Sequence, residues 1–259
     1  MVLVDTHAHL YLPHFSDDIG QVINNARDNR VLKILLPNID TESVSPMLDL
    51  CARFPDRCYP MIGLHPTSVD GNYKKKLSFL ESMAANGTYT AIGETGTDAH
   101  WDTDFLKEQE DSFITHLQWA KKMDLPVVIH ARKTMDSLIR IIKTHKNDNL
   151  RGVFHAFSGT PRQAREILNL GFKLGIGGVV TYKNSGLTPV LESVGLDDLV
   201  LETDSPYLSP VPERGKRNES AHILLIAEKI AEIKETTVEE VALKTSDNAA
   251  RLFNLDLDQ

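Results

Sequence analysis

The chain has 259 residues, of which 41% are hydrophobic and 25% are charged, a composition typical of a globular protein. Its formal net charge of −8 excludes a protein that holds nucleic acid through a general basic surface, so any polyanion must be bound locally. The two cysteines, Cys51 and Cys58, are too few for a secreted disulfide framework and fit a reduced compartment.

The first residues lack a basic segment followed by a long apolar core, and no run approaches the ~18 apolar residues of a membrane span. These patterns predict a cytoplasmic protein that does not enter a membrane. No linker or internal repeat divides the sequence, so we expect a single domain over residues 1–259. The oligomeric state is left open, with a monomer as the default expectation.

Eight short apolar runs rich in Val, Ile and Leu predict strands, and stretches with helical periodicity separate them. The runs are Val2–Val4, Val31–Leu36, Cys58–Gly63, Tyr89–Gly93, Pro126–Ile129, Gly152–Phe154, Phe172–Ile176 and Leu199–Glu202. Near-continuous apolar runs are typical of parallel strands that are buried on both faces. Eight such units predict an α/β fold, a (β/α)8 TIM barrel, although an open doubly wound sheet would alternate in the same way.

The predicted helices have apolar residues at helical spacing. In two of them the residues on one face are Ile19, Val22, Ile23 and Ala26, and Phe113, Leu117 and Ala120. Thr160, followed three residues later by Gln163, predicts a capping box at a helix start. After the eighth strand, Ala221–Ile233 and Val238–Phe253 are predicted as helices that complete the outer ring.

Strongly polar residues follow directly after six of the eight predicted strands. These segments are Asp5–His9, Gly63–Pro66, Gly93–Asp98, His130–Arg132, His155–Gly159 and Glu202–Pro206. In barrel enzymes the carboxyl ends of the strands meet at one rim, which holds the active site. We therefore expect these segments to surround one site, and this placement favours the barrel over an open sheet.

Four histidines and two carboxylates in these segments form a candidate metal-ligand set: His7, His9, Glu94, His130, His155 and Asp204. Residues two apart on a strand point to the same side, so His7 and His9 can bind one cation. Taken singly, each of the six could be a hydrogen-bonded structural residue or a cap. Together, six ionisable groups at one buried rim need a counter-charge, which two divalent ions supply. Mixed imidazole and carboxylate ligands suit Zn or Mn, whereas Mg prefers mostly oxygen.

The remaining histidines lie in predicted helices, their flanks or loops. We expect His14, His116, His145 and His222 to be solvated, while His100, in a loop near the predicted rim, is assigned no role.

The chain resembles the TatD family of metal-dependent deoxyribonucleases, within the amidohydrolase-like barrel superfamily, over nearly its whole length. The motifs that carry the resemblance are Asp-Thr-His-Ala-His, Ile-Gly-Glu-Thr-Gly-Thr-Asp, Val-Ile-His-Ala-Arg, Phe-His-Ala-Phe-Ser-Gly and Leu-Glu-Thr-Asp-Ser-Pro-Tyr-Leu. The sequence departs from the usual family pattern at Thr95, Thr97, Ala156 and Ser220, and none of these departures removes a candidate ligand.

The resemblance implies a nuclease that cleaves phosphodiester bonds with two divalent metal ions. It implies that His7 and His9 bind the first ion and that Glu94 bridges both. His130 and His155 would bind the second ion, and Asp204 would complete the first site and handle the proton. The implied partner is a nucleic acid, DNA by the family's activity, bound locally at the barrel mouth.

The chemistry of a phosphodiester suggests roles for these residues. Its anion repels hydroxide, so paired cations lower the barrier by neutralising charge. Glu94 suits a bridge, Asp204 suits a general base, and His65 can donate to a non-bridging phosphate oxygen, although a His-Pro turn explains it equally. A central pocket admits a strand end more readily than the middle of a duplex, which favours exonucleolytic cleavage.

Several residues beside the ligands are candidate substrate contacts. Arg132 can reach a phosphate or pair instead with Asp98. Arg217 belongs to a basic run at residues 213–218 that could contact a nucleic-acid backbone or be a solvated loop. Tyr207 and Phe157 could stack on a terminal base or serve only in packing.

Two other classes of function fit the same motifs less well. An amidohydrolase that acts on a small ester, lactone or amide often bridges its metals with a carboxylated lysine after the fourth strand, where this chain has Glu94. A non-enzymatic metal-binding scaffold would saturate its ions with protein ligands. Six convergent ligands together with His65 and Arg132 exceed what stability requires.

Overall fold

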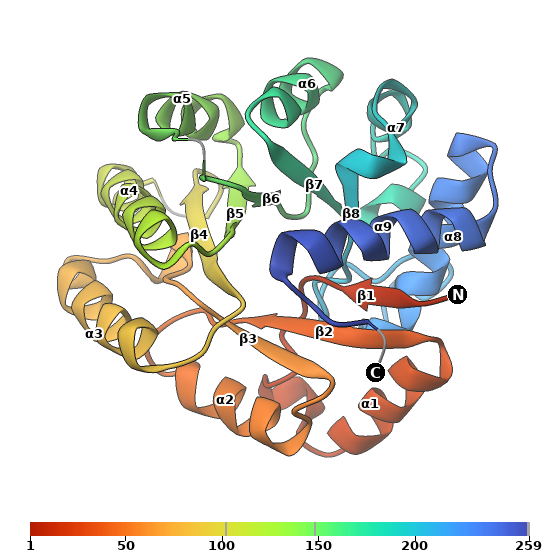
Figure 1. The fold of residues 1–259 in the computed structure, drawn as a ribbon, viewed down its shortest axis with the longest axis horizontal. Helices are drawn as coiled ribbons and strands as arrows, with labels where there is room; N and C mark the ends of the chain where they lie inside the picture. Colours follow the sequence, from red (N-terminus) through yellow and green to blue (C-terminus); the bar gives the residue numbers. More distant parts are fainter. Residues whose placement is uncertain (102, 148, 258–259) are drawn as a thin grey trace.

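The computed structural model describes residues 1–101, 103–147 and 149–257. Within these residues, eight parallel strands pair in chain order around a barrel, with helices outside them (Figure 1). The strands are β1 (Leu3–Asp5), β2 (Val31–Pro37), β3 (Cys58–Ile62), β4 (Ala91–Asp98), β5 (Val127–Arg132), β6 (Gly152–Phe154), β7 (Phe172–Ile176) and β8 (Leu199–Leu201). The predicted barrel is confirmed.

The helices alternate with the strands as the periodicity predicts. The α-helices are α1 (Ile19–Asp28), α2 (Val44–Arg53), α3 (Tyr73–Asn86), α4 (Leu106–Met123), α5 (Met135–His145), α6 (Pro161–Asn169), α7 (Thr188–Ser193), α8 (Ile223–Lys234) and α9 (Val238–Phe253). Short 3-10 turns cover Pro13–Phe15, Pro66–Ser68, Gly178–Thr181, Leu196–Asp198 and Ser220–His222. The predicted last helix is confirmed at both ends, and the capping box of Thr160 and Gln163 begins α6.

Two strands extend three or more residues beyond their predicted ends, into the polar segments, whereas β1 extends by one. β4 continues to Asp98 and β5 to Arg132, with Gly96 opposite His130 and Asp98 opposite Arg132. Pairing between the two strands satisfies the backbone hydrogen bonds of these polar residues, so strand structure continues where the apolar pattern stops. The extension holds the candidate ligands of β4 and β5 on rigid backbone.

The barrel closes between β1 and β8 at the level of the polar segments. Thr6 donates its backbone N–H to Leu201, and Asp204 donates to the carbonyl of His7 at 2.8 Å. His9 donates in turn to the carbonyl of Ser205 at 2.7 Å. The Asp5 carboxylate accepts from the backbone N–H and the hydroxyl of Thr203 at 2.9 and 2.6 Å. The first and last strands are therefore joined where they carry candidate ligands.

Apolar side chains fill the opposite end of the barrel, where the strands begin. We call this cluster the barrel floor: Val4, Leu35, Met61, Ala91, Val128, Val153 and Val200, with Ala249, Leu252 and Phe253. The last three residues belong to α9, which crosses this end of the barrel (Figure 1). The floor is therefore a packed and covered core, and access to the barrel axis is from the other end.

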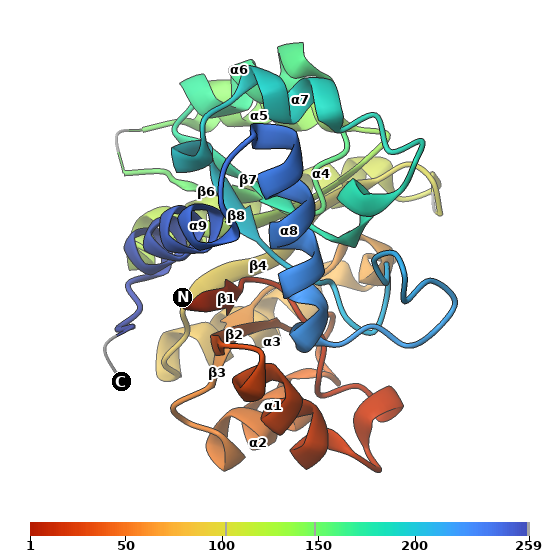
Figure 2. The same cartoon turned by 90° about the vertical axis from the view of Figure 1, so that its right-hand side faces the viewer.

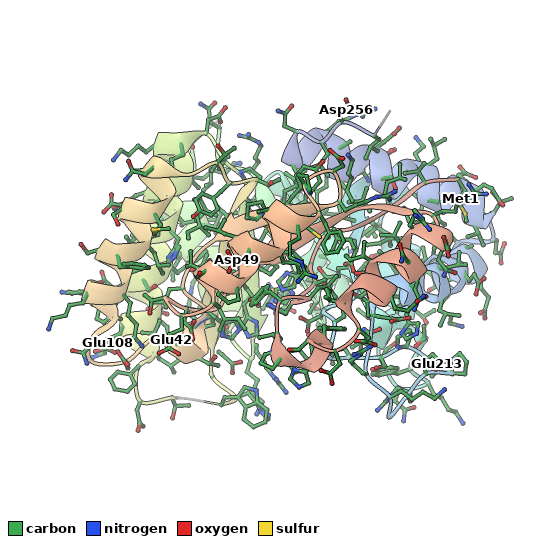
Figure 3. All side chains as sticks on the ribbon, turned by 90° about the horizontal axis from the view of Figure 1, so that it is seen from below. Met1, Glu42, Asp49, Glu108, Glu213 and Asp256 are labelled. Atoms are coloured by element: carbon green, nitrogen blue, oxygen red, sulfur yellow. The ribbon has the colours of Figure 1, made fainter. Side chains whose placement is uncertain are left out.

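The two ends of the barrel differ in their connections. Figure 2 shows both termini on one side and the long loop between β8 and α8 on the other. In Figure 3, Met1 and Asp256 lie at one end, whereas Glu42, Glu108 and Glu213, which follow β2, β4 and β8, lie at the other. We call this second end the mouth. No helix among the described residues combines the length and the hydropathy that crossing a bilayer requires.

Candidate metal centre

The segment after β1 places two imidazoles at the centre of the mouth. His7 and His9 are buried, and their Nε2 atoms lie 3.3 Å apart. The His7 Nε2 is 3.7 Å, and the His9 Nε2 3.5 Å, from Oδ1 of Asp204. His9 also contacts the Tyr11 hydroxyl through Nδ1 at 3.1 Å, which orients its ring. Where β1 and β8 meet, two imidazole nitrogens and one carboxylate therefore lie close enough together to bind a common ion.

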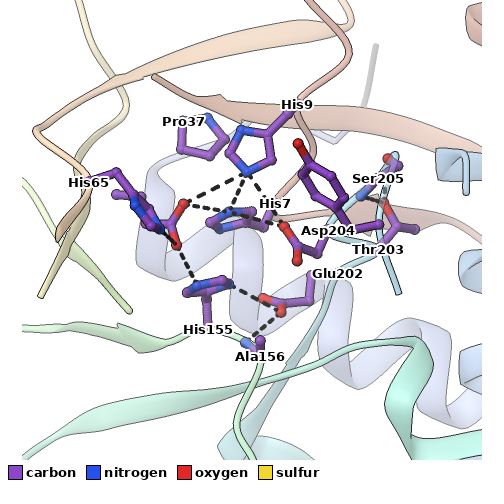
Figure 4. A network of polar contacts seen from close by, with 12 residues as sticks. His7, His9, Pro37, His65, His155, Ala156, Glu202, Thr203, Asp204 and Ser205 are labelled. Atoms are coloured by element: carbon purple, nitrogen blue, oxygen red, sulfur yellow. Dashed lines mark hydrogen bonds and ion pairs between the residues drawn. The ribbon is translucent and has the colours of Figure 1, made fainter. Parts of the chain in front are cut away.

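Glu94 contacts this group and a second group of imidazoles. Figure 4 shows His65 and His155 close to His7, His9 and Asp204. The Oε2 of Glu94 is 3.2 Å from His7 Nε2, and its Oε1 is 2.6 Å from His155 Nε2 and 2.9 Å from His130 Nδ1. The Nε2 of His65 lies 3.4 Å from the same Oε1. Both carboxylate oxygens therefore face imidazole nitrogens, one oxygen toward each group.

The strand that carries Glu94 depends on a glycine two residues later. Gly96 has a φ of 142°, and a Cβ at this position would lie 2.0 Å from the carbonyl oxygen of His130. Only glycine allows β4 and β5 to approach so closely here. The close approach brings Glu94 and His130 within contact distance of one another.

The candidate ligands have the spacing and the donor atoms that divalent ions need. Three groups have ligand atoms that all lie within 4.8 Å of one another: His7 with His155 and Asp204, His7 with His9 and Glu94, and His65 with Glu94 and His130. The nitrogens of His130 and His155 face each other at 3.2 Å, as those of His7 and His9 do at 3.3 Å. Paired nitrogen lone pairs repel unless a proton or a cation lies between them, and imidazole with carboxylate is the ligand set of Zn or Mn.

The electrostatics keep the carboxylates ionised. Burial alone would raise the pKa of Glu94, but His155, His65 and His7 outweigh it and hold the pKa well below its ordinary value. Burial likewise opposes ionisation of Asp204, and its contacts with His9 and His7 still lower its pKa. Burial lowers the pKa of His7 and of His65, which favours the neutral imidazole that binds metal.

These side chains line a cavity of about 830 Å³ that opens at the mouth. The ligand group forms its base, and Arg132, Trp101 and Tyr207 lie among the residues of its wall. Trp101 and Tyr207 are 69% and 47% exposed, so the wall offers aromatic surface to whatever enters. The volume lies in the range of pockets that bind small molecules.

Comparison with known proteins places this site in a family. The family model described as "TatD related DNase" matches residues 4–254. The chain is 35% identical to the uncharacterized metal-dependent hydrolase YabD of Bacillus subtilis, over 98% of this chain and all of that protein. The crystal structure of YjjV, a TatD homologue from Escherichia coli, superposes with a TM-score of 0.92 at 30% identity, covering 98% of each chain.

The chain belongs to the TatD family. It is also 35% identical to YcfH of E. coli, another uncharacterized metal-dependent hydrolase, over 99% of this chain and 97% of that one. These relatives support a metal-dependent hydrolase. A TatD structure from Entamoeba histolytica, at 22% identity and a TM-score of 0.83, shares the fold.

Two carboxylates of this TatD-family site were not proposed as part of it from the sequence. Asp98 lies 3.0 Å from Nε2 of His130, on the side of the ring away from Glu94. Glu202 is fully buried, accepts the N–H of Ala156, and lies 3.6 Å from Nδ1 of His155. Asp98 orients His130 and favours the tautomer that leaves Nδ1 free, whereas Glu202 makes only a longer ionic contact with His155. Their positions at strand ends were the only sequence signal.

Asp98 also decides between two alternatives for Arg132. The carboxylate accepts from His130 and from the backbone N–H groups of His100 and Trp101. In the described part of the chain Arg132 has no ion pair with Asp98, and its guanidinium lies 5.2 Å from the ring centre of Trp101. Arg132 is exposed at the wall of the cavity.

Other sequence-based expectations differ from the structure. His116 is not solvated but fully buried, because Nε2 accepts the N–H of Leu64 and Nδ1 donates to the carbonyl of Ser112. Phe157 is 2% exposed and packs in the core, so base stacking is excluded for it. Tyr207 remains available for stacking.

The basic run at residues 213–218 is engaged with its own chain. Arg217 binds both carboxylate oxygens of Asp18 at 2.7 and 2.8 Å and lies over the ring of Phe15. Lys216 pairs with Glu213 at 2.8 Å. This ion pair could not be predicted from the sequence, because Arg217 and Asp18 are far apart along the chain. Because Asp18 already binds its guanidinium, Arg217 is not proposed as a substrate contact.

Proposed function

We propose that this TatD-family hydrolase cleaves phosphodiester bonds of nucleic acid, DNA in particular, one nucleotide at a time from a strand end. One observation carries the proposal. The Glu94 carboxylate faces imidazoles on both of its oxygens, with Asp204 beside one group, and this arrangement matches a pair of divalent ions that share a carboxylate.

The contacts support the following assignment of ligands. His7, His9 and Asp204 would hold one ion, His130 and His155 the other, with Glu94 between them. His65 contacts the same oxygen of Glu94 and is close enough to serve either as a ligand or as a donor to the substrate. Two bound divalent ions would supply neutralisation of the phosphate charge and a hydroxide nucleophile at neutral pH.

The chain's own residues perform the remaining steps. Asp204, held ionised by His9 and His7, accepts the proton of the attacking water. His65 donates a hydrogen bond to a non-bridging phosphate oxygen as negative charge builds up there. Arg132 on the cavity wall offers a second cationic donor to the phosphate.

The shape of the site supports cleavage at an end. The metal centre lies at the cavity, whose lining includes the buried side chains of Glu94, His9 and His155. A duplex interior cannot reach such a point without unstacking, whereas a terminal nucleotide can enter. Tyr207, 47% exposed beside His9, offers a surface on which that terminal base can stack.

The test is hydrolysis of end-labelled single- and double-stranded oligonucleotides with Mn, Zn or Mg, alongside a panel of lactones and carboxylic esters. We expect a ladder of products shortened by single nucleotides, abolished in Glu94→Gln and retained in Glu228→Gln, which removes an exposed carboxylate on α8. Hydrolysis of a lactone or ester with no oligonucleotide cleavage above the Glu94→Gln background would instead establish the small-molecule alternative.

A further inference from the structure

We propose that a second cleft beside the metal centre binds a backbone phosphate of the strand that continues from the cleaved nucleotide. The inference rests on the proposed nuclease function and adds the position of the rest of the substrate. The cleft has a volume of about 740 Å³ and lies where β5 leads into α5, between α4 and α6. Because Ala131, Arg132 and Ser158 line both cavities, the two are adjacent. We call it the α5 cleft.

Three exposed cations line the α5 cleft: Arg132, Lys133 and Arg140. None of them has an ion pair within the residues that the structure describes, in contrast to Arg217, which Asp18 neutralises. The two acids of the cleft are already bound: Glu110 accepts from the Ser137 hydroxyl, and Asp136 accepts from Arg162 and Gln163 of α6. The cleft therefore has three cations against two carboxylates and keeps a net positive charge, in a chain whose net charge is −8.

The start of α5 adds backbone donors to the same cleft. The helix has 11 residues, and no side chain caps its N-terminus, because the Thr134 hydroxyl donates to the carbonyl of Thr97 at 2.9 Å instead. Free N–H groups at a helix start, with the helix dipole behind them, bind anions. Thr97 also lines the cleft, and its buried hydroxyl has no partner among the described residues.

Lys133 occupies a backbone conformation that favours glycine. Its φ is 61°, in the left-handed region where a side chain with a Cβ is strained. Glycine would be less strained at this turn between β5 and α5, yet the chain has a lysine, which lines the cleft. Strained residues of this kind concentrate at functional sites.

The ligand class follows from these donors. Lysine, arginine, hydroxyl groups and uncapped helix N–H groups together are the chemistry of a phosphate site. A cleft adjacent to the hydrolytic cavity is placed for the next phosphate of the same strand, not for a separate molecule. A substrate with one phosphodiester would fill the metal centre alone, whereas an oligonucleotide would occupy both sites.

The experiment compares these two substrates. One variant combines Lys133→Gln with Arg140→Gln, and a second has Lys133→Gly alone. The matched control combines Arg27→Gln with Lys122→Gln. It removes the same charge from two other helices, at side chains that are 55% and 70% exposed. Cleavage of bis(p-nitrophenyl) phosphate and of a single-stranded 20-mer is measured at several salt concentrations. Thermal unfolding is recorded for every protein.

We expect the double variant to raise the KM for the 20-mer about tenfold and to flatten its log–log salt dependence by about 0.7, for one lost phosphate contact. Its kcat/KM for bis(p-nitrophenyl) phosphate and the behaviour of the control should match the wild type. Lys133→Gly should weaken oligonucleotide binding while its Tm stays equal or rises, which a merely structural lysine would not do.

Three results would overturn the inference. If the wild type cleaves the 20-mer and the variants match it, the α5 cleft does not bind the strand, although the nuclease function stands. If both substrates are impaired equally, the effect is structural. If the wild type cleaves bis(p-nitrophenyl) phosphate but no oligonucleotide, the nuclease function fails and this inference fails with it.

Discussion

The mouth and the floor of the barrel are formed by the same strands, but ionisable side chains line the mouth and apolar side chains fill the floor. On β5, Val128 packs in the barrel floor, and His130, two residues later on the same side of the strand, contacts Glu94. On the first strand and its extension, Val4 lies in the floor and His7 at the metal centre. The floor is apolar and stabilises the fold. The mouth holds buried ionisable groups, which lower the stability of the protein unless a cation is bound.

The largest expected effect is on the mouth. Glu94→Gln keeps the volume of the side chain but removes the charge between the two imidazole groups. We expect hydrolysis to fall on the order of 10⁴-fold, because one change affects both groups of candidate ligands. The Tm of the metal-free variant should stay near that of the wild type. A variant that unfolds, or that retains activity within tenfold, contradicts the assigned role.

A substitution in the barrel floor should instead lower stability and leave catalysis unchanged. Phe253→Ala removes an aromatic side chain that is 3% exposed where α9 covers the barrel. We expect the free energy of unfolding to fall by about 3–5 kcal/mol, with the turnover of the molecules that remain folded unchanged. Urea denaturation measures the first quantity and assays under fully folding conditions the second. Leu243→Ala, which changes a 60% exposed residue of the same helix, should cost less than about 0.5 kcal/mol.

A buried histidine behind the mouth should make stability depend on pH. Burial lowers the pKa of His116 from 6.5 to about 4, so the unfolded chain gains a proton before the folded protein does. Stability should therefore be full above pH 6.5 and fall as the pH decreases toward 4, by roughly 3 kcal/mol from this residue. Denaturation at pH 7 and pH 4.5 should show a smaller difference in His116→Gln than in the wild type. Equal differences would mean that His116 is not held neutral.

The smallest effect concerns the carboxylates behind the ligands. Asp98→Asn removes the partner that orients His130 but leaves every candidate ligand in place. We expect metal affinity to fall about 10–100-fold with little change in Tm. Titration of the metal-free protein in competition with a chelator measures it. Asp18→Asn, which removes the Arg217 partner at the same end of the barrel, serves as the control and should bind metal like the wild type.

Much of this protein could be predicted from local patterns. Alternating apolar runs and amphipathic stretches were enough for the barrel, because strands buried on both faces have a composition that helices between them do not share. Polar residues at strand ends pointed to the candidate ligands, because parallel strands necessarily bring their carboxyl ends to one rim. The ends of β4 and β5 were misjudged where polar residues continue the strand pairing.

The contacts of the site were decided by tertiary structure. Whether Arg217 meets a substrate or Asp18, 199 residues earlier, depends on how the loop after β8 lies against α1. Similarly, His116 is buried because its nitrogens meet partners on its own helix and at Leu64. Sequence by itself determined which chemical groups reach the mouth, since strand order and side-chain alternation follow from local patterns. Only the folded chain selects the partner of each group, because hydrogen bonds and ion pairs act over a few ångströms between segments far apart in sequence.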